Sequence, residues 1–243
     1  RLHAERLRHF TEASNAVHEE YLSDPALLRQ YEDFLSWQIA YSLPYYQEFE
    51  EHPETAAAVE FVISDLIGTG ISARDADIAR IIPIMVRILP ARALQATASA
   101  MELNARALSI NLDICRHLSE QADLSEGISE RQYCAAFRES TTLDECAELI
   151  ELTIALGHTL EGLVHSRLLG MTLHAMHHPA HAAVFGAVQD FLEKGYETFH
   201  AIDDVDYFLD RFSECMTRTF TRICEEPLTN LVSLPSHPPA VSP

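Results

Sequence analysis

Apolar residues recur at intervals of three and four positions along most of this chain, which is the period of an amphipathic α-helix. No window shows the sustained alternation of β-branched and polar residues that is typical of half-buried strands. Only eight glycines interrupt the pattern. The sequence therefore predicts an all-α protein, a multi-helix bundle of about eight to nine helices.

Capping residues mark where several helices begin. An aspartate before a proline suits the N-cap and first helical position, and Ser or Thr three residues before Glu or Gln forms a capping box. A Ser-x-x-Asp spacing is a related start signal. The capping candidates are Asp24, Ser72, Ser129, Thr142 and either Asp203 or Asp204.

Prolines mark where helices stop or bend. Pro90 ends one apolar run and Pro179 interrupts a histidine-rich segment, so each predicts a helix end. Pro44 and Pro83 fall inside expected helices and predict a kink or a split there. The expected helices span residues 2–22, 25–50, 53–67, 73–88, 91–121, 129–138, 142–177, 180–201 and 204–225.

The expected helix at 91–121 has the most regular apolar pattern. One face repeats at alternating spacings of four and three, and a second apolar face lies beside it, so we expect the central helix of a bundle. The first face holds Leu94, Ala98, Met101, Ala105, Leu108, Leu112 and Cys115, and the second holds Leu103, Ala107, Ile110 and Ile114. Alternatively, one of these faces is a dimer contact, since small alanines would allow a partner helix to approach closely.

The length and apolar content allow a sizeable core. We expect a single domain over residues 1–226, with two packed halves near 1–121 and 129–226 as the alternative. The last segment, 227–243, is rich in proline and cannot continue a helix. It is expected to be an extended tail that is either mobile or laid over a neighbouring element.

Charge restricts the partners. Seventeen basic and 37 acidic residues give a formal net charge of −20. Such a charge repels phosphate backbones and anionic lipids, so we expect no binding to nucleic acid or to a membrane surface. The apolar stretch at 81–94 is interrupted by arginines and prolines and is shorter than the about 18 residues of a membrane span, so no membrane insertion is expected.

Cysteine usage and the first residues predict the compartment. The five cysteines are an odd number without Cys-x-x-Cys spacing, which favours reduced and mostly buried thiols. The first residues lack the apolar core and the cleavage site of a secretory signal. We therefore expect a cytoplasmic protein.

An acid–arginine cluster is the first candidate site. Asp77 lies three residues from both Arg74 and Arg80, so these side chains can form a ladder of ion pairs on one helical face. In a functional version, acids would converge with Arg74 in a cleft at the glycine turn at 68–70 and bind a small polar ligand. The candidate residues for that site are Asp65, Arg74, Asp75, Asp77 and Glu102.

A histidine-rich run is the second candidate site. His174 and His178 have the i, i+4 spacing that can place two imidazoles on one helical face for a metal ion, and His177 or His181 could add a third ligand. No acid or thiolate lies within the run. The alternative is a solvated helix end, where positively charged histidines also suit the helix dipole.

Several elements recur in the same order in a known family. They are Phe61, Asp65, Leu66 and Gly68, then Arg74 to Asp77, Ile81 to Pro90 and Met101 to Leu103, followed by Phe191 to Tyr196 and Phe199. With these elements the chain resembles the FFLEE- or FFLEELY-motif family of small bacterial proteins, which has no assigned activity. The resemblance covers roughly residues 35–225.

The chain departs from the family pattern at three positions. Val62, Ser64 and Ile67 stand where the family has Phe, Glu and Tyr. The loss of the first acid from a pair of carboxylates would impair general acid–base chemistry. We therefore interpret the motif as packing.

Two function classes remain open. The first is a non-enzymatic interaction or regulatory protein, with a protein partner or self-association, because the motifs give no complete catalytic constellation. The second is a small-ligand- or metal-binding helical bundle, with an enzyme among the alternatives. No phosphate-cradling or dinucleotide-binding glycine motif occurs, so no cofactor is predicted.

Overall fold

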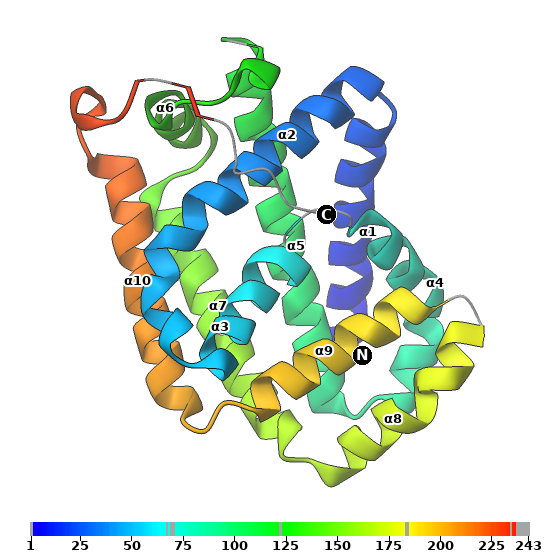
Figure 1. Ribbon diagram of the computed structural model, residues 1–243. Helices are drawn as coiled ribbons and strands as arrows, with labels where there is room; N and C mark the ends of the chain where they lie inside the picture. The colour runs from blue at the N-terminus through cyan, green and yellow to red at the C-terminus, as the bar shows by residue number, and fades with distance from the viewer. Residues whose placement is uncertain are drawn as a thin grey trace.

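The computed structural model describes residues 2–66, 68, 71–121, 123–182, 185–233 and 235–236, without the side chains of residues 168 and 182. Over these residues the fold is all-α, as predicted, and contains ten α-helices and no strand (Figure 1). The helical share is 87%, and the helix count exceeds the expected eight to nine. No helix in the described ranges is long and apolar enough to cross a membrane.

The helices follow one another through short connections. They are α1 (Leu2–Leu22), α2 (Pro25–Ser42), α3 (Pro53–Glu60), α4 (Ser72–Ile88), α5 (Ala91–Ser119), α6 (Glu130–Ser140), α7 (Leu143–Val164), α8 (Arg167–Ala182), α9 (Gly186–His200) and α10 (Val205–Glu225). Four further segments are helical but not α-helical. Three are 3₁₀-helices, η1 (Leu43–Glu51), η3 (Leu124–Glu126) and η4 (Leu228–Asn230), and one is a π-helix, η2 (Phe61–Leu66).

Most of the predicted helix starts are confirmed. Asp24 and Asp204 accept hydrogen bonds from backbone N–H groups of the first turn, and Ser129 and Thr142 each form a complete capping box. Ser72 was the exception, because the N-cap position of α4 belongs to the preceding residue, which forms no side-chain cap. The aspartate three residues later, Asp75, accepts hydrogen bonds from the Arg74 side chain instead of capping the helix.

Two predicted boundaries in the second half are wrong. The helix expected at 142–177 is split into α7 and α8, because Ser166 accepts a hydrogen bond from the N–H of Leu169 and so starts a new helix. Pro179 does not end α8, which continues to residue 182. A proline one turn from a helix end removes a single hydrogen bond, here the one that the carbonyl of the exposed Ala175 would accept from position 179, and that loss is tolerated.

The prolines of the first half behave differently from each other. Pro44 coincides with the predicted split, since α2 ends at Ser42 and the chain tightens into η1. Pro83 lies within an uninterrupted α4. The expected helix at 53–67 ends as α3 at Glu60 and widens into η2.

Helix α5 is the centre of the bundle, as predicted. Every residue of its first apolar face is buried, and α1, α2, α6 and α7 pack around it (Figure 1). The small residues Ala96, Ala98 and Ala105 are buried by helices of the same chain.

The described part of the C-terminal segment lies over its neighbours. Ser236 exchanges backbone hydrogen bonds with Ile128, and the indole N–H of Trp37 donates to the Ser236 hydroxyl. Residues 237–243 of the expected tail, and residues 69 and 70 of the expected glycine turn, lie outside the described residues. All five cysteines are unpaired, and four of them are buried.

Candidate functional site

Asp75, the central acid of the acid–arginine cluster, is fully buried and its carboxylate is saturated with partners. Its Oδ1 accepts hydrogen bonds from Nε and Nη2 of Arg74, at 2.9 and 2.8 Å. Its Oδ2 lies 2.8 Å from Nε2 of His18 and accepts a 2.7 Å hydrogen bond from Nδ2 of Asn104. The relative exposures of Asp75 and Arg74 are 0% and 5%, so solvent and a soluble ligand have no room at this carboxylate.

The network continues from His18 to a tyrosine. Nδ1 of His18 lies 2.7 Å from the Tyr21 hydroxyl, and burial together with the charge of Asp75 raises the pKa of Tyr21 to about 12. Nδ2 of Asn104 also donates to Ser14. A Tyr–His–Asp series resembles a proton relay, but all of these residues are buried. The network can join α1, α4 and α5, and offers no exposed nucleophile.

Arg74 carries the network to the end of η2. Its Nη1 donates to the backbone carbonyl of Asp65 and its Nη2 to that of Leu66, two carbonyls at a helix end that need donors. Its guanidinium also lies 4.5 Å from the ring centroid of Phe191 on α9. A Cβ atom on Gly68 would lie 2.2 Å from the Ser64 carbonyl oxygen, so only glycine permits this chain path.

Two of the sequence segments that carry the family resemblance, residues 61–68 and 191–199, pack against each other. The rings of Phe61 and Phe191 stack at 5.3 Å, and a Cβ atom on Gly195 would lie 2.9 Å from the Phe61 ring. Nζ of Lys194 lies 2.6 Å from Oδ2 of Asp65. These motif residues therefore form one contact region between η2 and α9.

The other acids predicted for the acid–arginine cleft pair with different bases. The ion pairs are Asp65–Lys194 (2.6 Å), Asp77–Arg80 (3.0 Å), Glu102–Arg6 (2.5 Å) and Glu102–Arg106 (3.0 Å). Of the four candidate acids, Asp75 alone places its carboxylate on the Arg74 guanidinium. The structure thus does not bring the five candidate residues together around one ligand position.

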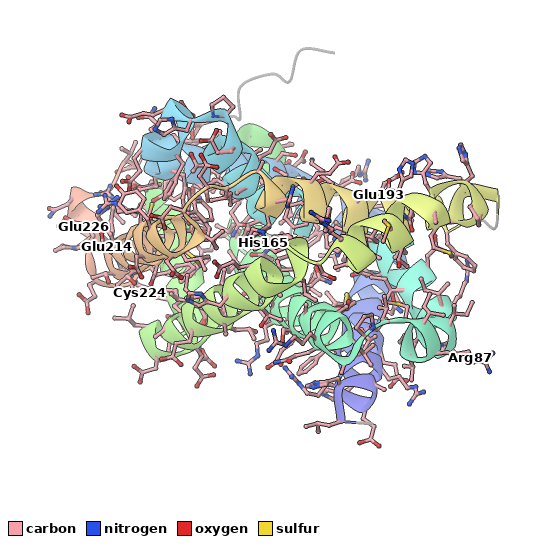
Figure 2. The ribbon with its side chains drawn as sticks, turned by 90° about the horizontal axis from the view of Figure 1, so that it is seen from below. Arg87, His165, Glu193, Glu214, Cys224 and Glu226 are labelled. Atoms are coloured by element: carbon pink, nitrogen blue, oxygen red, sulfur yellow. The ribbon has the colours of Figure 1, made fainter. Side chains whose placement is uncertain are left out.

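The histidine run faces carboxylates from the next helix. Helices α8 and α9 pack side by side across one end of the bundle, and Figure 2 looks onto this end with Glu193 labelled. Nδ1 of His177 lies 2.8 Å from Oε2 of Glu193, and Nε2 of His181 lies 2.9 Å from Oδ1 of Asp190. The possible ligand atoms of His177, His181 and Asp190 all lie within 4.8 Å of one another.

Gln189 fixes the position of Glu193. Its Nε2 donates to Oε1 of Glu193 at 2.8 Å and to the backbone carbonyl of Leu173 at 2.7 Å, which ties α9 to α8. Burial alone would raise the pKa of Glu193, but hydrogen bonds from Gln189 and His177 outweigh burial and hold that pKa below its ordinary value. Glu193 is therefore an oriented carboxylate that is ready to accept positive charge.

The sequence prediction started from the spacing of His174 and His178, but the histidines that contact the acids are His177 and His181. His174 and His178 are exposed and lie outside the cluster of His177, His181 and Asp190. Asp190 and Glu193 were missed because they belong to another helix. Asp190 and Glu193 have i, i+3 spacing, and His177 and His181 have i, i+4 spacing, so each pair shares one helical face. If the two consecutive helices are assumed to pack as a hairpin, these spacings predict that the acids meet the histidines.

A second group of possible metal ligands is looser. His158, Glu161 and Asp206 have ligand atoms within 4.8 Å of one another, with His158 Nδ1 4.0 Å from Glu161 and 3.4 Å from Asp206. The three side chains are 37–74% exposed. His177, His181 and Asp190, together with Glu193 beside His177, form the α8–α9 cluster. This cluster is the better organised of the two, because the buried Gln189 positions Glu193.

Comparisons with known proteins identify a family for this chain. No curated protein and no solved structure matches the chain significantly. A family model does match, over residues 18–228, and this range includes Asp75, His18 and the α8–α9 cluster. The chain therefore belongs to the family described as a domain of unknown function (DUF8198).

Proposed function

We propose that this protein is a non-enzymatic, metal-binding regulatory protein that holds a divalent transition-metal ion between α8 and α9. The observation that carries the proposal is the convergence of His177, His181 and Asp190, whose ligand atoms lie within 4.8 Å of one another. The exposures of His177, His181 and Asp190, at 42%, 44% and 57%, leave them open to an ion from solvent.

The donor set fits zinc. Imidazole nitrogens and carboxylate oxygens bind Zn²⁺ at about 2.0–2.2 Å, and a tetrahedral site then needs ligand atoms about 3.3 Å apart. Small rotations of these partly exposed side chains would reach that spacing. Glu193 supplies a fourth potential ligand, a second carboxylate, next to His177, and Gln189 orients it in the manner of an outer-shell partner. A bound ion would tie α8 to α9 more firmly than the present hydrogen bonds.

The metal content of protein purified without a histidine tag tests this proposal. After dialysis against metal-free buffer, we expect close to one zinc per chain in the wild type and little in His177→Ala/His181→Ala. Replacing Gln189 by Leu should weaken zinc binding by about 10- to 100-fold, as loss of an outer-shell partner does. Equal zinc contents in the wild type and the double variant would contradict the proposal.

Self-association is a second candidate function, and the C-terminal half of α4 favours it. Ile84 and Ile88 lie one turn apart and are 50% and 47% exposed. Residues 78–101 contain three arginines and no acid, whereas the whole chain carries a charge of −20. An acidic surface of a second copy, or of another protein partner, would complement the exposed Arg87, which lies in the same turns of α4 as Ile84 and Ile88. Ile84→Glu should then lower the sedimentation coefficient at high protein concentration; an unchanged value would exclude this face.

The proposal also covers the cellular location of the protein and the role of its FFLEE-like residues. Five unpaired cysteines support a cytoplasmic location, and the net charge supports partners other than nucleic acid. The FFLEE-like residues are proposed to serve packing, which the contacts of Phe61 with Phe191 and Gly195 support. The buried Asp75 network is likewise proposed to serve structure.

A further inference from the structure

A cavity of about 140 Å³ is lined by residues of α2, α5, α6, α7 and α10. Its size is close to the about 150 Å³ of an engineered apolar cavity that binds benzene. None of its lining side chains in the described part of the chain is charged. A charged occupant would therefore lose its hydration without gaining a counter-charge.

One wall of this central cavity carries two amides with unused hydrogen-bonding capacity. Nε2 of Gln38 donates to Oδ1 of Asn111 at 3.0 Å and to the Tyr133 hydroxyl at 3.3 Å. Oε1 of Gln38 and Nδ2 of Asn111 form no hydrogen bond with any described residue. Asn111 is only 7% exposed, and buried polar groups nearly always have partners. The cavity wall therefore carries one hydrogen-bond acceptor and one donor that no described residue uses.

Tyr133 adds a second donor to the same wall. Burial raises the pKa of its phenol well above the ordinary value, so the hydroxyl keeps its proton. That hydroxyl accepts from Gln38, and its hydrogen has no acceptor among the described residues. Donors and an acceptor therefore converge within the reach of one small molecule.

Most of the remaining cavity lining is apolar. It includes Leu103 and Ile110 of α5, Leu149 of α7, and Phe212 and Met216 of α10. Water beside these side chains would lack the two to four polar partners that a buried water needs. An occupant that satisfies the whole lining has an apolar body and one neutral polar group.

We propose that the central cavity is a binding site for a small uncharged molecule, about the size of a six-membered ring, whose polar group bonds to Gln38, Asn111 and Tyr133. This site is separate from the α8–α9 cluster and does not depend on metal binding. It shares its lining between helices from both halves of the chain, so an occupant would stabilise their packing.

Phenol, toluene and benzoate are suitable probes, tested by calorimetric titration into the full chain at neutral pH. Phenol has the ring and a neutral polar group, toluene lacks the polar group, and benzoate is charged. We expect saturable binding of phenol at one site, weaker binding of toluene and no binding of benzoate. Absence of saturable phenol binding, or benzoate binding equal to phenol binding, would overturn the proposal.

Two alanines of the same helix locate the site. Ala107→Leu fills the central cavity and should abolish phenol binding. Ala96→Leu is the matched control, because Ala96 lines a different, largely apolar cavity of about 100 Å³. The control should bind phenol as the wild type does. Loss of phenol binding in Ala96→Leu but not in Ala107→Leu would place the ligand elsewhere and overturn the proposal.

A third variant keeps the test decisive if Ala107→Leu fails to fold. Asn111→Leu removes the amide whose N–H group has no partner among the described residues, but retains a side chain of similar size. The preference for phenol over toluene should fall by about three- to tenfold, the effect of one hydrogen bond. An unchanged preference in a folded Asn111→Leu protein would show that the polar wall does not recognise the ligand.

Discussion

Oδ2 of Asp75 lies 2.8 Å from Nε2 of His18. The two residues are 57 positions apart in the sequence, and their buried contact joins α4 to α1. The other oxygen of the same carboxylate holds Arg74, which in turn binds the end of η2. Three helices and one turn thus depend on a single buried charge. The neighbouring Asp77 forms only an i, i+3 pair with the exposed Arg80.

Asp75→Asn should strongly destabilise the protein. The substitution leaves the Arg74 guanidinium buried without its counter-charge, and breaking a buried pair in this way costs about 3–5 kcal/mol. The free energy of unfolding, measured by chemical denaturation, should fall by that amount.

Asp77→Asn is the matched control for Asp75→Asn, two residues away in the same helix. The Asp77 side chain is 14% exposed but its partner Arg80 is 68% exposed. Ion pairs with such access to solvent contribute at most about 1 kcal/mol, so this variant should unfold within that margin of the wild type. Equal losses of stability in the two variants would show that burial does not separate the roles of the two acids.

Leu108→Ala should test the core of the central helix. Leu108 is 1% exposed within α5, and truncating a buried leucine costs about 2–5 kcal/mol. A denaturation midpoint equal to that of the wild type would contradict the assignment of this face to the core.

Glu130 should make the stability of the protein dependent on pH. Burial raises the pKa of Glu130, but hydrogen bonds from Arg222, the Val232 N–H and the Tyr41 hydroxyl outweigh burial and lower it. A carboxyl whose pKa is lower in the folded state contributes stability above its unfolded pKa, and loses that contribution as pH falls through the folded value.

The Glu130→Gln variant isolates this contribution. It should be less stable than the wild type at neutral pH, and the difference should shrink as the pH falls through the acid range. Thermal unfolding followed across that range provides the measurement. A difference that stays constant with pH would mean that Glu130 does not carry the linkage.

The sequence was sufficient for the fold class and for the local starts of helices. Residues such as Asp24, Ser129 and Thr142 act on N–H groups two or three positions away, so their neighbours in sequence decide the outcome. The buried face of α5 follows from its period in the same way. The helix end predicted at Pro179 was wrong because a proline near a helix end costs little. The helix start at Ser166 was missed because a serine cap without a following acid is a weak signal.

The sites depended on contacts that no local spacing encodes. His18 meets Asp75 across 57 residues, and Asn104 reaches the same carboxylate from a third helix. Both look like ordinary polar positions in the sequence. The partner acids of His177 and His181 lie beyond a helix connection, and a pattern read within a single helix found histidines but not carboxylates.

Calorimetric titration of zinc into tag-free protein tests the metal site most directly. The decisive comparison is between His177→Ala/His181→Ala and His174→Ala/His178→Ala, since both pairs have i, i+4 spacing in α8 but only the first faces Asp190 and Glu193. We expect the wild type and the His174/His178 variant to bind one zinc per chain with similar affinity, and the His177/His181 variant to lose that binding. Equal weakening in the two variants, or no zinc binding by the wild type, would contradict a metal site between α8 and α9.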